Sequence, residues 1–223
     1  MVAILFDLDG TLYDDRAYVK AGFRSAAVYL REKHGVKTFG DMVWEYSVER
    51  NFGTVFNRIL ADYDLPETEL NDLIAAYHDC DPDLQLYPDT EAALMELSDV
   101  YQTAVVTGGK HGGRKLELFG LEDSFDTVYV TADHETSKHE LKPFKTVLDK
   151  LDASAEESIF VGDNPELDFH RPNQLGMTTV WVRRRTTIFR SPESTEARPN
   201  YVLPDLSLVP AVADEIVELN EVE

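Results

Sequence analysis

The 223-residue chain has little of several features that would place it in particular protein classes. Its one cysteine, Cys80, excludes a framework of internal disulfides and is compatible with a reducing compartment. No apolar run approaches the roughly 20 residues that a membrane-spanning helix requires. Hydrophobic sequence follows Met1 directly, without a basic stretch, which predicts no secretory signal. We therefore expect a soluble cytoplasmic protein that makes no membrane contact.

Positive charge is also scarce, because 42 Asp and Glu residues stand against 21 Lys and Arg residues and give a formal net charge of −21. Such a surface repels nucleic acid and anionic membranes, so neither is expected as a partner. The same repulsion opposes compaction unless dissolved cations screen it. We hypothesise a halophilic source with a salt-rich cytoplasm; an ordinary acidic enzyme is the alternative.

Hydrophobic residues are plentiful, at 43% of the chain, and many fall in short runs typical of buried parallel strands. Amphipathic helical stretches alternate with these runs and predict an α/β fold, a doubly wound, mostly parallel, Rossmann-like sheet. Pro172 should break or kink the helical stretch at 166–175. The predicted strands cover residues 3–8, 103–106, 127–130, 158–161, 178–182 and, more weakly, 201–203.

The alternation stops between residues 14 and 86, where four helical stretches follow one another without a convincing strand. The first of them, 17–30, ends before Gly35, a residue that suits a helix C-cap. We interpret this segment as a helical bundle inserted after the first strand. The predicted domains are thus an α/β core of residues 1–13 and 87–223, and a helical cap of residues 14–86.

Two carboxylates follow the first predicted strand in the sequence Asp7-Leu8-Asp9-Gly10-Thr11. Ligands of open α/β sheets bind beyond the carboxyl ends of the strands, which is where this motif lies. Burying charge is costly unless the charge is paired or binds a metal. The position after an apolar strand therefore separates this motif from other D-x-D pairs of this acidic chain, such as Asp62 and Asp64.

Three further strand ends carry polar residues that could join these carboxylates. Asp163 follows the run 159–161 and Gly162, and Asp168 comes five residues later, where a first-turn helix acid is the alternative interpretation. Thr107 and Gly108 follow another run and could offer a hydroxyl and backbone N–H groups to phosphate oxygens. Lys142, before Pro143, could reach the same phosphate; Lys138 is its rival.

In their chain order these residues resemble the four motifs of the haloacid dehalogenase-like superfamily, phosphatase branch. The motifs are Asp7-x-Asp9-Gly10-Thr11, then Thr107, then Lys142, then Gly162-Asp163 through Asp168. The resemblance covers the whole predicted core, and the helical insertion is similar to the family's α-helical cap. Gly108 stands where many relatives have Asn, so the side-chain contact that this asparagine would make to phosphate is missing here.

The resemblance implies a phosphatase for small phosphorylated metabolites. It implies that Mg²⁺ is held by the carboxylates of Asp7 and Asp163 and the main-chain carbonyl of Asp9. Asp7 would be the nucleophile that forms an aspartyl-phosphate. Asp9, with a pKa raised by its anionic neighbours, would be the general acid and base, and Asp168 would orient Lys142 or a metal-bound water.

Other activities share this fold. A phosphomutase would keep all four motifs, and a non-catalytic phosphate-binding module is a further alternative. A dehalogenase would not need Asp9, and a phosphonatase would need a lysine of the cap for which the sequence gives no specific support. Outside the motifs, we expect Arg183, Arg184 and Arg185 to be solvated side chains that protect a sheet edge.

Overall fold

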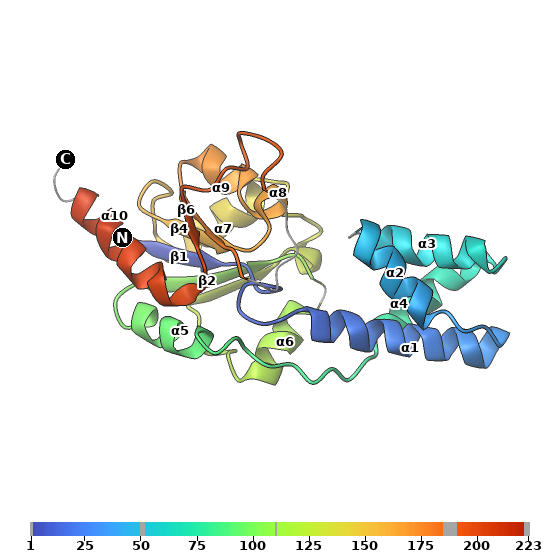
Figure 1. The fold of residues 1–223 in the computed structure, drawn as a ribbon. Helices are drawn as coiled ribbons and strands as arrows, with labels where there is room; N and C mark the ends of the chain where they lie inside the picture. The colour runs from blue at the N-terminus through green and yellow to red at the C-terminus, as the bar shows by residue number, and fades with distance from the viewer. Residues whose placement is uncertain (1, 50–51, 110, 185–190, 221–223) are drawn as a thin grey trace. The chain divides into compact units, whose positions relative to one another are not determined.

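The computed structural model describes residues 2–49, 52–109, 111–184 and 191–220, and Figure 1 shows its fold. The chain divides into two compact units. One, here called the sheet unit, comprises Met1–Asp14 and Gln85–Glu223; the other, the helical unit, comprises Asp15–Leu84. No helix in the described ranges combines the length and the apolar character needed to cross a membrane.

A six-stranded, all-parallel sheet forms the centre of the sheet unit, in the order β3-β2-β1-β4-β5-β6. This order is that of a doubly wound Rossmann-like sheet, so the predicted α/β class is confirmed. The chain reverses its direction of winding between β1 and β4, where such folds bind their ligands. The strands are β1 (Ala3–Phe6), β2 (Gln102–Thr107), β3 (Thr127–Val130), β4 (Ile159–Gly162), β5 (Thr178–Val182) and β6 (Tyr201–Leu203).

Helices cover both faces of the sheet, with α5, α6 and α10 on one side and α7, α8 and α9 on the other (Figure 1). Helix α7 shows why they pack there, because Phe144, Val147, Leu148 and Leu151 recur at helical spacing and are all buried. The helices are α5 (Thr90–Ser98), α6 (Gly112–Phe119), α7 (Lys142–Leu151), α8 (Pro165–Asp168), α9 (His170–Leu175) and α10 (Val209–Asn220), with the 3₁₀ turns η2 (Thr131–His134) and η3 (Leu206–Leu208).

The stretch expected to be interrupted by Pro172 consists of two short helices, α8 and α9. The interruption lies at Phe169, ahead of the proline, and Pro172 is buried within the first turn of α9. A proline is tolerated in a first turn because the N–H groups there have no partner inside the helix. This interruption leaves Asp168 at the end of α8, beside the carboxyl edge of β4.

The helical unit contains α1 (Arg16–His34), α2 (Phe39–Glu49), α3 (Phe52–Asp62), the 3₁₀ turn η1 (Glu67–Glu69) and α4 (Leu70–His78). Its interior is a cluster of aromatic side chains, in which Phe23 lies against Phe56 and Tyr77 with ring centroids 5.9 and 5.5 Å away. Helix α1 runs to His34, four residues past the predicted end, and Gly35 caps it as expected, because this glycine adopts a left-handed conformation and its N–H donates to the carbonyl of Arg31.

Candidate functional site

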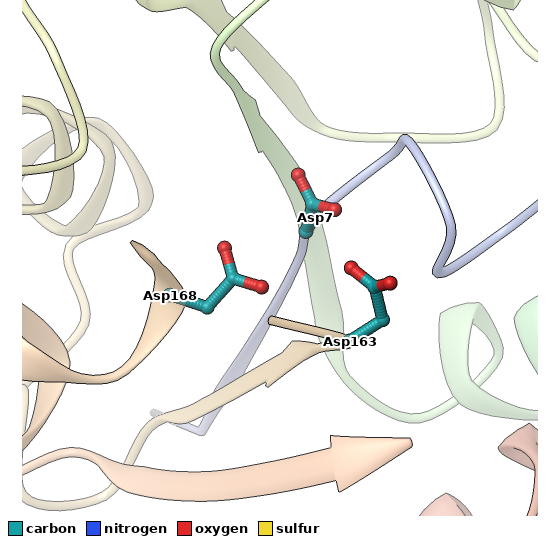
Figure 2. Close-up of side chains that lie close together, drawn as sticks. All are labelled: Asp7, Asp163 and Asp168. Atoms are coloured by element: carbon teal, nitrogen blue, oxygen red, sulfur yellow. The ribbon is translucent and has the colours of Figure 1, made fainter. Parts of the chain in front are cut away.

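Three aspartates converge beyond the carboxyl ends of β1 and β4 (Figure 2). The register pairs Phe6 of β1 with Val161 of β4, so the residues that follow these strands reach the same edge of the sheet. Asp7, Asp163 and Asp168 are all buried, and each offers a carboxylate oxygen within 4.8 Å of the others. The structure thus brings together three of the acidic residues that the sequence singled out.

Short-range contacts hold the Asp7 carboxylate in place. Its backbone N–H donates to the carbonyl of Val161 at 2.8 Å, which extends the β1–β4 pairing by one residue. The hydroxyl of Thr11, four residues on, donates to Asp7 Oδ2 at 3.2 Å. Because Thr11 is itself fully buried, this hydroxyl fixes one carboxylate oxygen.

Glycine is required at Gly10, in the turn after Asp9, for two reasons. Its φ of +81° is one that other residues rarely adopt, and a Cβ atom there would lie 2.4 Å from Asp163 Oδ2. The backbone of Asp163 is held by Trp181, whose Nε1 donates to the main-chain carbonyl oxygen of Asp163 at 2.8 Å. The glycine therefore lets the first motif approach the last one closely.

The lysine at the cluster is Lys138, and the sequence-based choice of Lys142 is corrected on this point. Lys138 Nζ contacts Asp7 Oδ1 and lies 2.8 Å from Asp168 Oδ1, with a side chain that is 1% exposed. Lys142 is exposed at the first position of α7. Pro143 favours a helix start, so the Lys-Pro pair marks the beginning of α7, whereas Lys138 lies in the loop that leads from η2 to α7.

Asp168 therefore positions Lys138, and not Lys142. Its Oδ1 accepts from the Lys138 ammonium, and its Oδ2 accepts from the N–H of Asn164 at 3.0 Å. Burial disfavours the charged ammonium, but the charges of Asp168 and Asp7 outweigh that effect and raise the pKa of Lys138. The lysine is held as a fixed positive charge within a group of buried carboxylates.

Asp9 has two partners that the sequence analysis missed, Lys115 and Tyr13. Lys115 Nζ and the Tyr13 hydroxyl both contact Asp9 Oδ1. Lys115 comes from α6 and is buried. The sequence could have indicated that Lys115 is buried and paired, because this lysine falls on the same helical face as Leu116 and Phe119, where an apolar residue is expected.

The two aspartates of the first motif differ in acidity. The pKa of Asp7 is raised to about 7, chiefly by burial, against the lowering effect of Lys138 and with a further increase from the charges of Asp168 and Asp9. Burial would also raise the pKa of Asp9, but the Lys115 ammonium and the Tyr13 hydroxyl hold it below its ordinary value. The expected raised pKa of Asp9 is thus wrong for this structure, because that expectation counted the anionic neighbours and missed the cation.

Thr107 ends β2 at the same edge of the sheet, as expected. It is completely buried, and within the described ranges its hydroxyl has no hydrogen-bond partner. A buried hydroxyl without a partner is costly, and it is explained where a ligand completes the bond. Gly108, the next residue, is exposed, and a Cβ atom there would meet nothing within 4 Å.

The donor set fits a magnesium ion. Mg²⁺ takes oxygen ligands and is commonly held by one or two carboxylates, and the three buried aspartates supply such oxygens close together. Three buried carboxylates face one ammonium, and burial keeps the pKa of Asp7 raised to about 7 although Lys138 lowers it. A divalent cation would offset the excess of negative charge.

Arg184 joins the turn of the first motif to the segment that leads into α5. Its guanidinium binds both carboxylate oxygens of Asp89 at 2.8 Å and donates to the carbonyl of Thr11 at 3.1 Å. The same group lies 3.7 Å from the ring centroid of Tyr87. The expectation of a solvated arginine cluster is therefore wrong for Arg184, while Arg183 is exposed and Arg185 lies outside the described residues.

Comparisons with known proteins agree with this geometry. The family described as "Haloacid dehalogenase-like hydrolase" matches residues 4–182. Glyceraldehyde 3-phosphate phosphatase of Methanopyrus kandleri is 29% identical over 218 residues, which cover 89% of this chain and 91% of the relative. A Caldanaerobacter subterraneus protein named as a pyrophosphatase is 29% identical over 215 residues, 92% of this chain and 91% of the relative. The crystal structure of a HAD phosphatase from Thermococcus onnurineus is similar with a TM-score of 0.71 and 28% identity, covering 95% of this chain and 97% of that one.

Proposed function

Because the chain is a phosphatase of the haloacid dehalogenase-like hydrolase family, we propose that it hydrolyses a small phosphate monoester through an aspartyl-phosphate on Asp7, with Mg²⁺ as cofactor. The observation that carries the proposal is the buried group of Asp7, Asp163, Asp168 and Lys138 at the point where the sheet reverses its winding. Intact acidic residues at every position of the site favour catalysis over a binding module.

Asp7 and Asp163 would hold the magnesium ion with their carboxylates, and Asp9 with its main-chain carbonyl. When bound, the ion offsets the negative charge of the phosphate and of the carboxylates around it. Lys138 supplies further positive charge, and Asp168 keeps its ammonium in place. Four carboxylates without such cations would repel a phosphate dianion.

The proposed reaction has two steps. In the first, one oxygen of the Asp7 carboxylate attacks phosphorus, and the phosphorus–oxygen bond to the leaving alcohol breaks. In the second, water attacks phosphorus, phosphate departs and the Asp7 carboxylate is regenerated. Thr107, Gly108 and Lys138 would bind the phosphoryl oxygens, and the buried hydroxyl of Thr107 would then have a partner.

Asp9 would transfer the protons in both steps. Lys115 and Tyr13 keep its carboxylate ionised in the structure described here, which suits the second step, where it takes a proton from water. The first step needs a protonated Asp9 to donate to the leaving oxygen. A bound phosphate group adds negative charge beside Asp9 and favours uptake of that proton.

The substrate class is proposed from the relatives and the helical unit. A triose phosphate is the first choice, because the Methanopyrus kandleri relative is a glyceraldehyde 3-phosphate phosphatase. Pyrophosphate is the second, from the name of the Caldanaerobacter protein. We also propose that residues 14–86 act as a cap that admits small soluble substrates, and that the chain works in the cytoplasm without nucleic-acid or membrane partners.

Phosphate release from a panel of substrates tests the proposal. The panel would contain glyceraldehyde 3-phosphate, pyrophosphate, phosphoglycolate, sugar phosphates and nucleoside monophosphates, each with Mg²⁺ or with EDTA. We expect metal-dependent release by the wild type and a loss on the order of 10³-fold or more in Asp7→Asn. Asp123→Asn removes an exposed carboxylate elsewhere and should keep full activity.

Two results would contradict this function. Metal-dependent release that persists in Asp7→Asn would remove Asp7 from the reaction. No release from any member of the panel, with the fold verified by circular dichroism, would favour a phosphomutase. That activity would be detected as phosphate transfer between positions of a sugar phosphate primed with a sugar bisphosphate.

A further inference from the structure

The helical unit contains a pocket of about 310 Å³ formed by its own residues. The second half of α1, the loop after it and the first residues of α2 line this pocket. Ala27, Val28, Val36 and Phe39 contribute apolar surface to it. The pocket shares no residue with the carboxylate cluster, so the proposed reaction gives it no role.

Positive charge gathers around this pocket in a chain of net charge −21. Arg24 and Arg31 lie seven residues apart on α1, which places them two turns apart on one face, and Lys37 comes from the following loop. In the part of the chain that the structure describes, none of these three cationic side chains forms an ion pair with a carboxylate. The guanidinium of Arg24 lies instead 5.7 Å from the ring centroid of Phe39.

Thr38, immediately before α2, supplies a second and independent indication. The residue is completely buried and lines the pocket, yet its hydroxyl has no hydrogen-bond partner in the part of the chain that the structure describes. A threonine at this position usually accepts a bond from the first turn of the helix. Its carbonyl does receive the N–H of Met42 at 2.9 Å, so the backbone is that of a helix start, while the hydroxyl has no partner among the described residues.

The beginning of α2 adds a weaker attraction for anions, because the first N–H groups of a helix lack intrahelical partners. The acidic residue of that turn, Asp41, accepts a hydrogen bond from the Tyr63 hydroxyl. We propose that the pocket binds a small organic anion: Arg24, Arg31 and Lys37 face its charged group, Thr38 donates a hydrogen bond, and Val28 and Phe39 contact its apolar body.

Titration with 1-anilinonaphthalene-8-sulfonate tests the proposal, because this dye combines a sulfonate with an apolar aromatic body and fluoresces when it is bound. We expect saturable binding to the wild type and competition by inorganic sulfate. Arg31→Gln should weaken binding about tenfold, the size expected for one charged hydrogen bond. Lys20→Gln removes the same charge from α1 outside the pocket lining and should leave binding unchanged.

Thr38→Val separates binding from folding. Valine keeps the shape of threonine and removes a hydroxyl that bonds to nothing in the described part of the protein, so the melting temperature should stay the same or rise. Dye affinity should nevertheless fall severalfold. Equal affinity in wild type, Arg31→Gln and Thr38→Val would overturn the proposal, as would the absence of saturable binding up to about 10 mM dye. A folded Asp7→Asn protein should bind the dye normally, so failure of the proposed reaction and failure of this site are distinguishable.

Discussion

Lys138 has a structural role that its sequence context does not indicate. Its neighbours in the chain are polar, yet its ammonium is buried between Asp7 and Asp168. A buried ion pair often contributes little net stability, because removing charges from water offsets their attraction. We therefore interpret this arrangement as a device for binding negative charge, in which the carboxylates hold the ammonium where a phosphoryl group would need it.

Lys138→Met should lower kcat/KM for phosphate release by about 10²- to 10³-fold, since it removes a fixed charge from the phosphoryl oxygens. Lys142→Met is the matched control and should retain nearly full activity, because Lys142 is exposed at the start of α7. Steady-state kinetics on both purified variants measure this, with circular dichroism to verify the fold. The reverse order of activities would restore Lys142 to the site.

The sequence predicted some of these residues better than others, for a physical reason. Asp7 and Asp163 follow buried strands, and the parallel sheet brings strand ends together whatever the loops do. Lys138 lies in a loop, whose path no periodicity predicts. The choice of Lys142 relied on a proline that proved to mark a helix start.

Among the structural elements, the turn after β1 has the narrowest requirements. Gly10 combines a φ of +81° with a distance of only 2.4 Å between the place that a Cβ atom would occupy and Asp163 Oδ2. Gly35, at the end of α1, has a similar φ of +74° and no atom within 4 Å of such a Cβ. Substituting Gly35 would thus introduce backbone strain alone, whereas substituting Gly10 would introduce both backbone strain and a steric clash.

Gly35→Ala should therefore cost about 1 kcal/mol in the free energy of unfolding, measured by urea denaturation, and leave activity unchanged. Gly10→Ala should cost more, about 2–3 kcal/mol, because Asp163 must also move. Its phosphate release should fall at least about tenfold, since a displaced Asp163 no longer meets Asp7. Equal losses of stability and activity in the two variants would refute this account of the turn.

The Arg184–Asp89 pair holds three elements together around the same turn. Asp89 accepts from Arg184 and from the N–H of Leu206 at 2.8 Å, while Arg184 donates to the carbonyl of Thr11. Burial alone would raise the pKa of Asp89, but these hydrogen bonds hold it below its ordinary value. A carboxylate with a lowered pKa in the folded state stabilises the fold above the unfolded-state pKa of about 4.

This stabilisation should be lost as the pH falls through the lowered pKa of Asp89. The free energy of unfolding of the wild type should exceed that of Asp89→Asn by a constant amount between about pH 5 and pH 8. Below about pH 4 the difference should shrink, because the wild-type carboxylate becomes protonated. Urea denaturation across this pH range measures it, and a difference that does not change with pH would show that the charge of Asp89 is unimportant.

At the level of elements, alternation of strands and helices predicted the sheet, because buried parallel strands are recognisable as short apolar runs. The prediction for the arginine cluster after β5 was wrong for Arg184, because it relied on the local sequence alone. Its interpretation assumed an exposed edge, whereas β5 pairs with both β4 and β6 and directs Arg184 to Asp89. The neighbouring strands determine where Arg184 lies, and a local sequence pattern does not reveal them.

On the scale of the whole molecule, the net charge of −21 dominates. Mutual repulsion of acidic side chains opposes the compact state, and dissolved salt screens it over a Debye length of about 10 Å at 0.1 M. The melting temperature should therefore rise from low salt to molar KCl, together with activity if the source is halophilic. Thermal denaturation in a KCl series measures this. A melting temperature that does not depend on KCl would contradict the halophilic hypothesis.

Chemical trapping of the phosphorylated enzyme tests the central claim most directly. Borohydride reduces an acyl phosphate of aspartate to homoserine, which peptide mass spectrometry locates within the chain. After mixing with Mg²⁺ and the best substrate of the panel, we predict homoserine at position 7, with none when substrate is omitted. Homoserine at Asp9 or Asp163, or none at any position while phosphate is still released, would contradict an aspartyl-phosphate on Asp7.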